Sequence, residues 1–186
     1  LPKCCSGVKQ CREDAAALRQ GHVKLSSLKS IVTIETISAI ETIATTNHKE
    51  MITYSAENVK MPQIRRRDTT AWIRRVAATY GRKVGEVGYL FCDDEKILEV
   101  NREYLQHDYY TDIITFDYDE GDEINGDLVI SLDTVRSNAE QLGKPYDEEL
   151  HRVIIHGILH LCGINDKGPG EREIMEAAED RALAMR

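Results

Sequence analysis

The chain has 186 residues, of which 41% are hydrophobic and 30% are charged, and its formal net charge is −8. No apolar run approaches the roughly 18 residues that a membrane-spanning helix needs, which excludes a transmembrane protein. The five cysteines, an odd number at irregular positions, argue against the disulfide framework of a small secreted protein, so we expect a soluble protein of the cytoplasm.

Residues 1–50 differ in composition from the rest of the chain. They hold three of the five cysteines and none of the eleven aromatic residues, so little in them can anchor a hydrophobic core. We therefore expect residues 1–50 to be an N-terminal extension outside the fold and residues 51–186 to form the domain. Met51 is the expected natural start of the protein.

From residue 51 onward, strands and helices alternate. Runs of apolar and β-branched residues predict strands at 52–54, 86–92, 112–117 and 127–131. Apolar residues at helical spacing predict helices at 64–80, 94–104, 132–142, 147–162 and 171–185. A polar, turn-rich connection at 118–126 joins the last two strands. This order predicts a single α+β domain, a small mixed sheet packed by about five helices.

The helix at 147–162 and the loop after it carry an HxxxHxxGxxD motif, formed by His156, His160, Gly163 and Asp166. Two histidines four residues apart lie on one face of a helix, so their rings can converge on one ion. Gly163 can adopt the left-handed conformation that ends a helix, which lets Asp166 turn back to the same point. Three protein ligands leave a fourth position for water, as in catalytic zinc sites. The motif therefore predicts one zinc ion per chain.

Apolar residues surround the motif and predict a buried central helix. Histidines inside such a helix need partners, because an unsatisfied buried polar group costs about 1–3 kcal/mol. The alternative to a metal is a pair of core histidines that hydrogen-bond to the backbone or to carboxylates. His151 lies about 140° around the helix from His156, so we interpret it as a surface histidine or one that supports a ligand. We interpret Cys162 as a core residue.

Gly157 follows the first histidine, at the position where HExxH zinc peptidases have the glutamate that acts as general base. Glycine cannot accept a proton, so the sequence disfavours a zinc metallopeptidase. The chemistry must rely on the metal and on groups elsewhere.

The stretch HGILHLCGIND at 156–166 resembles the HGxLHLxGxDH signature of the YbeY family of bacterial metal-dependent endoribonucleases. The resemblance covers roughly residues 51–186 and includes NREY at 101–104, TDIITF at 111–116 and GDLVI at 126–130. It implies a zinc-dependent, single-strand-specific endoribonuclease that acts in rRNA processing, at the 3′ end of small-subunit rRNA, and in ribosome quality control. The implied partners are RNA, the small ribosomal subunit and its assembly factors.

Two positions depart from the family's pattern. Asp166 stands where the third ligand is usually histidine; aspartate binds zinc, but its negative charge makes the metal a weaker Lewis acid. Leu105 stands where the family usually has an arginine that acts at the phosphate, and leucine cannot stabilise developing charge. His107 could partly replace that arginine, although a loop histidine is more often solvated. The departures keep open a non-catalytic ribosome-assembly factor with a structural metal.

The charge of the domain bears on RNA binding. Subtracting the seven basic and five acidic residues of the first fifty leaves 17 basic and 27 acidic residues, a net charge of −10. Phosphate recognition normally needs a positive surface. The candidate RNA-binding residues are Arg65, Arg66, Arg74 and Arg75. The alternative is that these arginines form an ordinary solvated helix surface.

Overall fold

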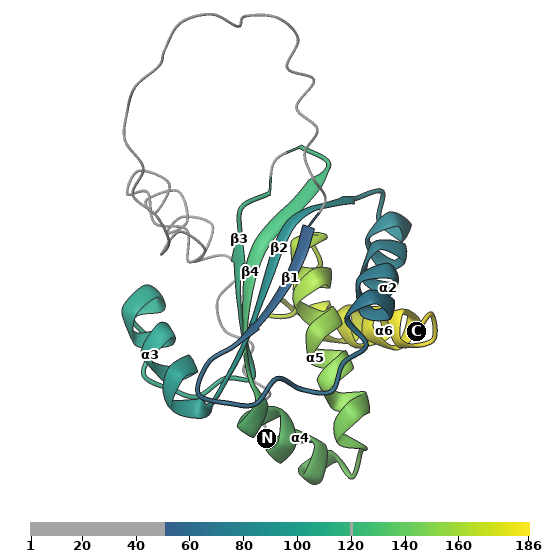
Figure 1. The fold of residues 1–186 in the computed structure, drawn as a ribbon. Helices are drawn as coiled ribbons and strands as arrows, with labels where there is room; N and C mark the ends of the chain where they lie inside the picture. Colours follow the sequence, from purple (N-terminus) through teal and green to yellow (C-terminus); the bar gives the residue numbers. More distant parts are fainter. Residues whose placement is uncertain (1–50, 120) are drawn as a thin grey trace, which may run out of the picture.

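The structure, a computed structural model, describes residues 51–119 and 121–186, and the extension expected at 1–50 lies outside the described residues. Four strands form one sheet in the order β1-β2-β4-β3 (Figure 1). Their bounds are β1 Met51–Ala56, β2 Lys83–Cys92, β3 Ile113–Asp117 and β4 Glu123–Ser131. β1, β2 and β4 are parallel, whereas β3 runs antiparallel to β4, so the sheet is mixed as predicted.

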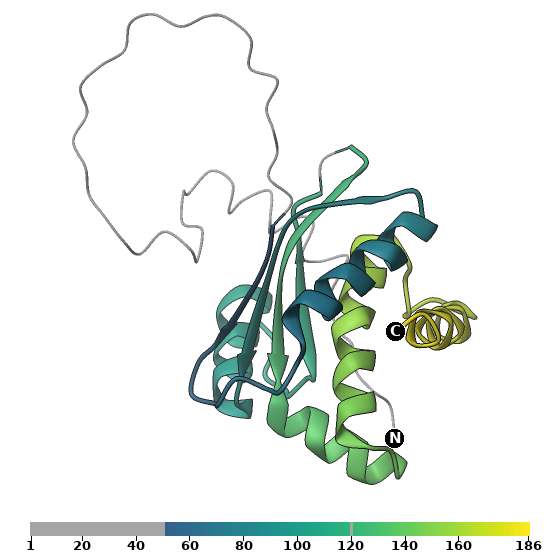
Figure 2. The ribbon, with the colours of Figure 1, turned by 45° about the vertical axis from the view of Figure 1, so that its right-hand side comes forward.

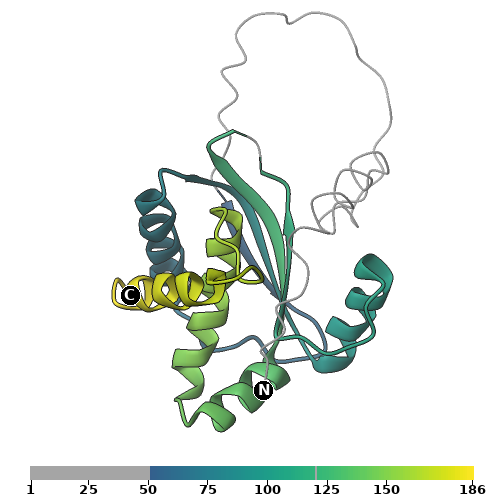
Figure 3. The ribbon, with the colours of Figure 1, turned by 180° about the vertical axis from the view of Figure 1, so that it is seen from behind.

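Five helices pack around this sheet in the described part of the chain. They are α2 Arg66–Thr79, α3 Asp94–Leu105, α4 Leu132–Leu142, α5 Tyr146–Leu161 and α6 Glu171–Leu183. Figure 2 shows α2, α5 and α6 on one face of the sheet and α3 on the other, and Figure 3 shows the same division from behind. None of the five is both long and apolar enough to cross a membrane. The predicted α+β class with about five helices is confirmed.

The side chains of β3 and β4 alternate between two cores, as successive residues of a strand point to opposite faces. Ile113, Leu128 and Ile130 pack in the main core with α2, α5 and α6. Ile114 and Val129 pack in a smaller core with residues of α3. Both faces of these strands are therefore covered, and α5, which contacts β3 and β4, lies on a fully buried surface.

The strand β4 begins earlier than predicted. Glu123, Ile124 and Gly126, expected in the polar connection, pair with β2, and Ile124 is fully buried. The register shifts between Val84 and Val87, and the side-chain Oδ1 of Asn125 accepts a hydrogen bond from the backbone of Glu86 at 2.8 Å. A polar residue that indicates a loop in the sequence thus supplies a hydrogen-bond acceptor for the backbone of an irregular stretch of strand.

Candidate metal centre

The helix α5 carries two candidate ligands, and the turn at its end positions the third. Three acidic residues occupy the first turn of α5, where their negative charge complements the helix dipole and favours the start of the helix. At the other end, Gly163 has φ of 92° and donates to the carbonyl of His160, while Ile164 donates to the carbonyl of Leu159. These two bonds form a Schellman motif, which ends the helix and reverses the chain. The predicted role of Gly163 is confirmed.

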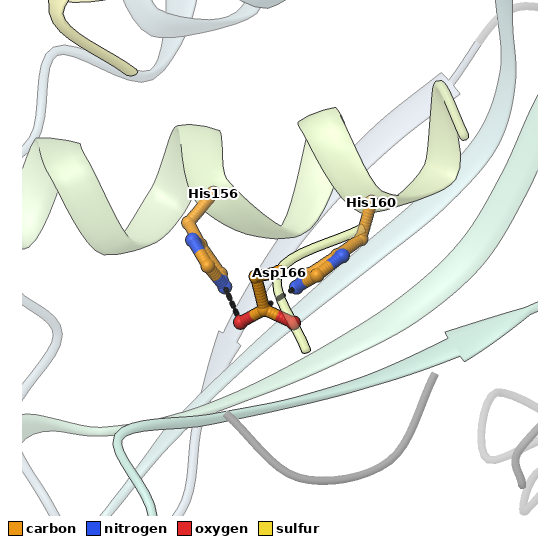
Figure 4. A group of neighbouring side chains, drawn as sticks. All are labelled: His156, His160 and Asp166. Atoms are coloured by element: carbon orange, nitrogen blue, oxygen red, sulfur yellow. Dashed lines mark ion pairs between the residues drawn. The ribbon is translucent and has the colours of Figure 1, made fainter. Parts of the chain in front are cut away.

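The reversal brings Asp166 under the two histidines of the helix. In Figure 4 both rings project from one side of α5 toward the Asp166 carboxylate. Its Oδ2 lies 3.9 Å from Nε2 of His156 and 3.8 Å from Nε2 of His160. These distances are shorter than twice a zinc–ligand bond of about 2.0–2.2 Å, so one ion can reach both atoms of each pair. The structure thus brings together the three predicted ligands.

The hydrogen bonds of the two imidazoles orient them for a cation. Nδ1 of His160 lies 2.8 Å from the backbone carbonyl of Ile164, which can only accept, so Nδ1 carries the hydrogen. In the neutral ring this leaves the lone pair on Nε2, which is buried and has no hydrogen-bond partner among the described residues. Nδ1 of His156 lies 2.6 Å from Oε1 of Glu179, which likewise accepts. Two Nε2 atoms and a carboxylate facing one point suit a metal ion.

Burial keeps His160 in the form that binds metals. Burial and the neighbouring His156 lower the pKa of His160 to about 3, although its hydrogen bond to the Ile164 carbonyl opposes the shift. The ring is therefore neutral at ordinary pH, as a histidine ligand must be.

Comparison with known families decides the identity of the domain. The family model described as Endoribonuclease YbeY matches residues 46–185. The chain belongs to the YbeY family. It is accordingly an endoribonuclease, a hydrolase of phosphodiester bonds.

Individual relatives agree with this assignment. Proteins named Endoribonuclease YbeY from Phocaeicola vulgatus and Bacteroides thetaiotaomicron are 76% and 74% identical to the chain over 135 residues, which are 73% of this chain and 98% of each relative. A Thermotoga maritima protein, solved in solution, has a similar fold, with a TM-score of 0.54 at 24% identity, covering 73% of this chain and 88% of that one. The YbeY resemblance predicted from the sequence is confirmed.

Leu105, at the position of the usual YbeY arginine, and His107, two residues later, are not among the three residues of the metal centre. Leu105 is 4% exposed and packs in the smaller core beneath α3, so it stabilises the fold there. The ring of His107 stacks on Tyr109 with centroids 5.2 Å apart, and its Nδ1 lies 3.1 Å from the Tyr109 hydroxyl. A catalytic role for His107 stays a prediction.

The four candidate RNA-binding arginines lie on or next to α2. Arg65 and Arg75 line a cleft of about 580 Å³, together with His151 in the first half of α5. The Arg75 guanidinium also donates to the backbone carbonyl of Met185 at 3.0 Å. Within the described chain, none of the three metal-competent residues lines this cleft. RNA binding by Arg65, Arg66, Arg74 and Arg75 stays a prediction.

His151 was interpreted as a surface histidine or as one that supports a ligand, and the surface alternative is wrong. It is 3% exposed, its Nδ1 donates to the carbonyl of Asp147 at 2.7 Å, and its ring lies 5.9 Å from that of Trp72. The residue faces the contact between α5 and α2, which the helical angle alone could not reveal. Cys162 packs against the main core as predicted, and burial raises its pKa to about 12.

Buried His151 makes the stability of the metal-free protein depend on pH. Burial lowers its pKa below the ordinary 6.5, although the hydrogen bond to Asp147 opposes the shift. The unfolded chain then binds the proton more readily, so the free energy of unfolding should fall as pH drops below about 6.5, by at most about 1.4 kcal/mol per pH unit from this group. Denaturant unfolding in chelator at pH 7.5, 6.5 and 5.5 measures this. His151→Gln should show a smaller slope, and an unchanged slope contradicts the assignment.

Two residues of the site were missed from the sequence. Glu179 on α6 is 7% exposed and contacts both His156 and Arg152 of α5. Burial raises the pKa of Glu179, but the hydrogen bonds from His156 and Arg152 outweigh it, so the pKa falls below its usual range. Met175 and Ala182 mark the buried side of α6. Glu179 lies four residues after Met175 and three before Ala182, so helical spacing places it on the same buried side. That placement was the signal available in the sequence.

Proposed function

We propose that the domain at 51–186 is a zinc-dependent, single-strand-specific endoribonuclease that acts in rRNA processing. The expected substrate is the 3′ end of small-subunit rRNA, and the expected wider role is ribosome quality control. One observation carries the zinc assignment: Nε2 of His160 is buried without a hydrogen-bond partner and faces the Asp166 carboxylate. A divalent cation satisfies both groups, whereas a core histidine would need another donor in that place.

The residues of the site divide the work between them. His156, His160 and Asp166 would hold the ion. When bound, zinc would supply a Lewis acid for the phosphodiester and would lower the pKa of water. The burial of both histidines, 7% and 3% exposed, limits competing contact with bulk water. Gly157 supplies no general base, which argues against a metallopeptidase.

The proposed partners are RNA, the small ribosomal subunit and its assembly factors, in the cytoplasm. The domain's net charge of −10 opposes nonspecific RNA binding. The exposed residues Arg65, Arg66, Arg74 and Arg75 would supply the local positive surface, and the resulting binding should weaken as salt increases. We also propose that residues 1–50 are an extension outside the enzymatic domain; the family match supports this for residues 1–45, since it begins at residue 46.

A ribosome-assembly factor with a structural metal is the second candidate, favoured by the apolar Leu105 at the usual arginine position. Asp166→Ala separates the two candidates. We expect it to lower metal content and cleavage of single-stranded rRNA fragments together, because the remaining histidines lose the charged ligand. Glu99→Ala, at a carboxylate that is 61% exposed and paired with Lys96, is the control. Loss of metal with unchanged rRNA processing contradicts the catalytic assignment.

A further inference from the structure

The C-terminal helix contacts the metal centre through one buried carboxylate. Oε1 of Glu179 lies 2.6 Å from Nδ1 of His156, and its Oε2 accepts from Arg152 at 2.9 Å. The second guanidinium nitrogen of Arg152 donates to Asp180 at 2.8 Å. Each oxygen of the Glu179 carboxylate therefore has its own donor, and both donors come from α5.

We propose that Glu179 is a positioning residue for the metal ligand His156, and that Arg152 holds Glu179 in place. The inference rests on the proposed function, since it concerns the same zinc site. It assigns a role in metal binding to α6, a helix that carries none of the three ligands.

The chemistry of an ionised carboxylate gives the physical reason. Such a group can only accept hydrogen bonds, so the hydrogen of neutral His156 must sit on Nδ1 and the lone pair on Nε2. Nε2 is the atom that faces Asp166. Without Glu179 the ring could carry its hydrogen on either nitrogen and could rotate. A carboxylate at Nδ1 also makes the imidazole a stronger donor to a metal.

The two histidines are oriented by different parts of the fold. Nδ1 of His160 donates to the carbonyl of Ile164, a neutral group in the turn just after α5. Nδ1 of His156 instead donates to a charged group 23 residues further along the chain. The orientation of His156 therefore depends on the packing of α6 against α5, whereas that of His160 is built into the helix end.

A purely structural role is the competing explanation. The Arg152–Glu179 ion pair joins α5 to α6, with side-chain exposures of 19% and 9%, so its loss alone would lower stability. Such a role predicts no change in the metal affinity of the molecules that remain folded. Metal affinity measured separately from stability distinguishes the two roles.

The test compares zinc affinity in wild-type protein, Glu179→Gln and Glu179→Ala, by competition with a chromophoric chelator. We expect Glu179→Gln, which keeps an acceptor but loses the charge, to weaken binding by about 10–100-fold. Glu179→Ala should weaken it further. Glu176→Gln is the matched control, because Glu176 is 56% exposed on the same helix and pairs with Arg172. It should bind zinc as the wild type does.

The outcomes separate the two proposals. If the wild type binds zinc and Glu179→Gln binds it equally well, Glu179 does not position His156, while the proposed function stands. If the wild type takes up no zinc, both proposals fail. Should the Glu179 variants not fold, nitrogen-15 NMR of the metal-free wild type decides: a hydrogen on Nδ1 of His156 supports the inference, because no metal is there to impose it, and a hydrogen on Nε2 alone overturns it.

Discussion

Replacing His160 with alanine is expected to remove zinc binding and RNA cleavage together. His160 supplies one of three converging ligand groups, and its neutral ring is already oriented with Nε2 toward Asp166. Loss of groups that merely orient metal ligands typically costs 10–100-fold, so loss of a ligand should lower cleavage by at least about 100-fold. Metal analysis of the purified proteins and cleavage of single-stranded rRNA fragments measure the two effects.

Thermal unfolding supplies an independent measurement of the same variant. An ion that binds only the folded state stabilises it, by about 2.7 kcal/mol at 100 times the dissociation constant. Added zinc should therefore raise the melting temperature of the wild type and leave that of His160→Ala unchanged. His151→Ala is the control, because His151 is a buried histidine of the same helix outside the metal group. Loss of metal with full cleavage would place the nuclease activity elsewhere.

The part of this site that could be predicted lies close together in the sequence. His156, His160, Gly163 and Asp166 fall within one helix end and its turn, and their geometry follows from helical periodicity and one left-handed residue. The supporting residue Glu179 comes from another helix, and its place depends on how α6 packs against α5. Spacing in the sequence carries no information about that packing.

The elements of the fold could also be predicted where the pattern that specifies them is local in the sequence. The strand β3 and the second half of β4 carry apolar residues on both faces, because each face packs in a different core. The start of β4 was missed, since Glu123 and Asn125 are polar; Glu123 pairs with β2, and the Asn125 side chain accepts a hydrogen bond from β2 at an irregular stretch. Pairing with a strand about forty residues away decided the conformation there, against the local preference for a loop.

Gly157 has two consequences, one for the chemistry and one for the packing, and only the first could be predicted from the sequence. The sequence indicates that a general base is missing there. The structure adds that no side chain fits, because a Cβ at this position would lie 2.9 Å from Cδ1 of Ile113 and closer still to Cδ2 of Leu128. α5 crosses β3 and β4 at this glycine, so a peptidase-like glutamate would push the metal-binding helix away from the sheet.

We expect Gly157→Ala to lower the free energy of unfolding by about 1–3 kcal/mol, the usual cost of overpacking a core. In an open helix the same change would be stabilising, by about 0.5–1 kcal/mol, so the sign alone tests the close approach. Denaturant unfolding of the metal-free protein measures it. The adjacent His156 should also shift, which lowers zinc affinity.

A double-mutant cycle with Leu128→Ala isolates the clash from other effects of the substitution. Leu128→Ala alone should cost about 2–5 kcal/mol through the cavity that it leaves. In the Gly157→Ala background it should cost less, because the added methyl group occupies part of the space that the leucine vacates. The two changes should therefore couple by at least about 0.5 kcal/mol. Additive effects, or a gain in stability from Gly157→Ala alone, would mean that α5 does not rest on the sheet at this glycine.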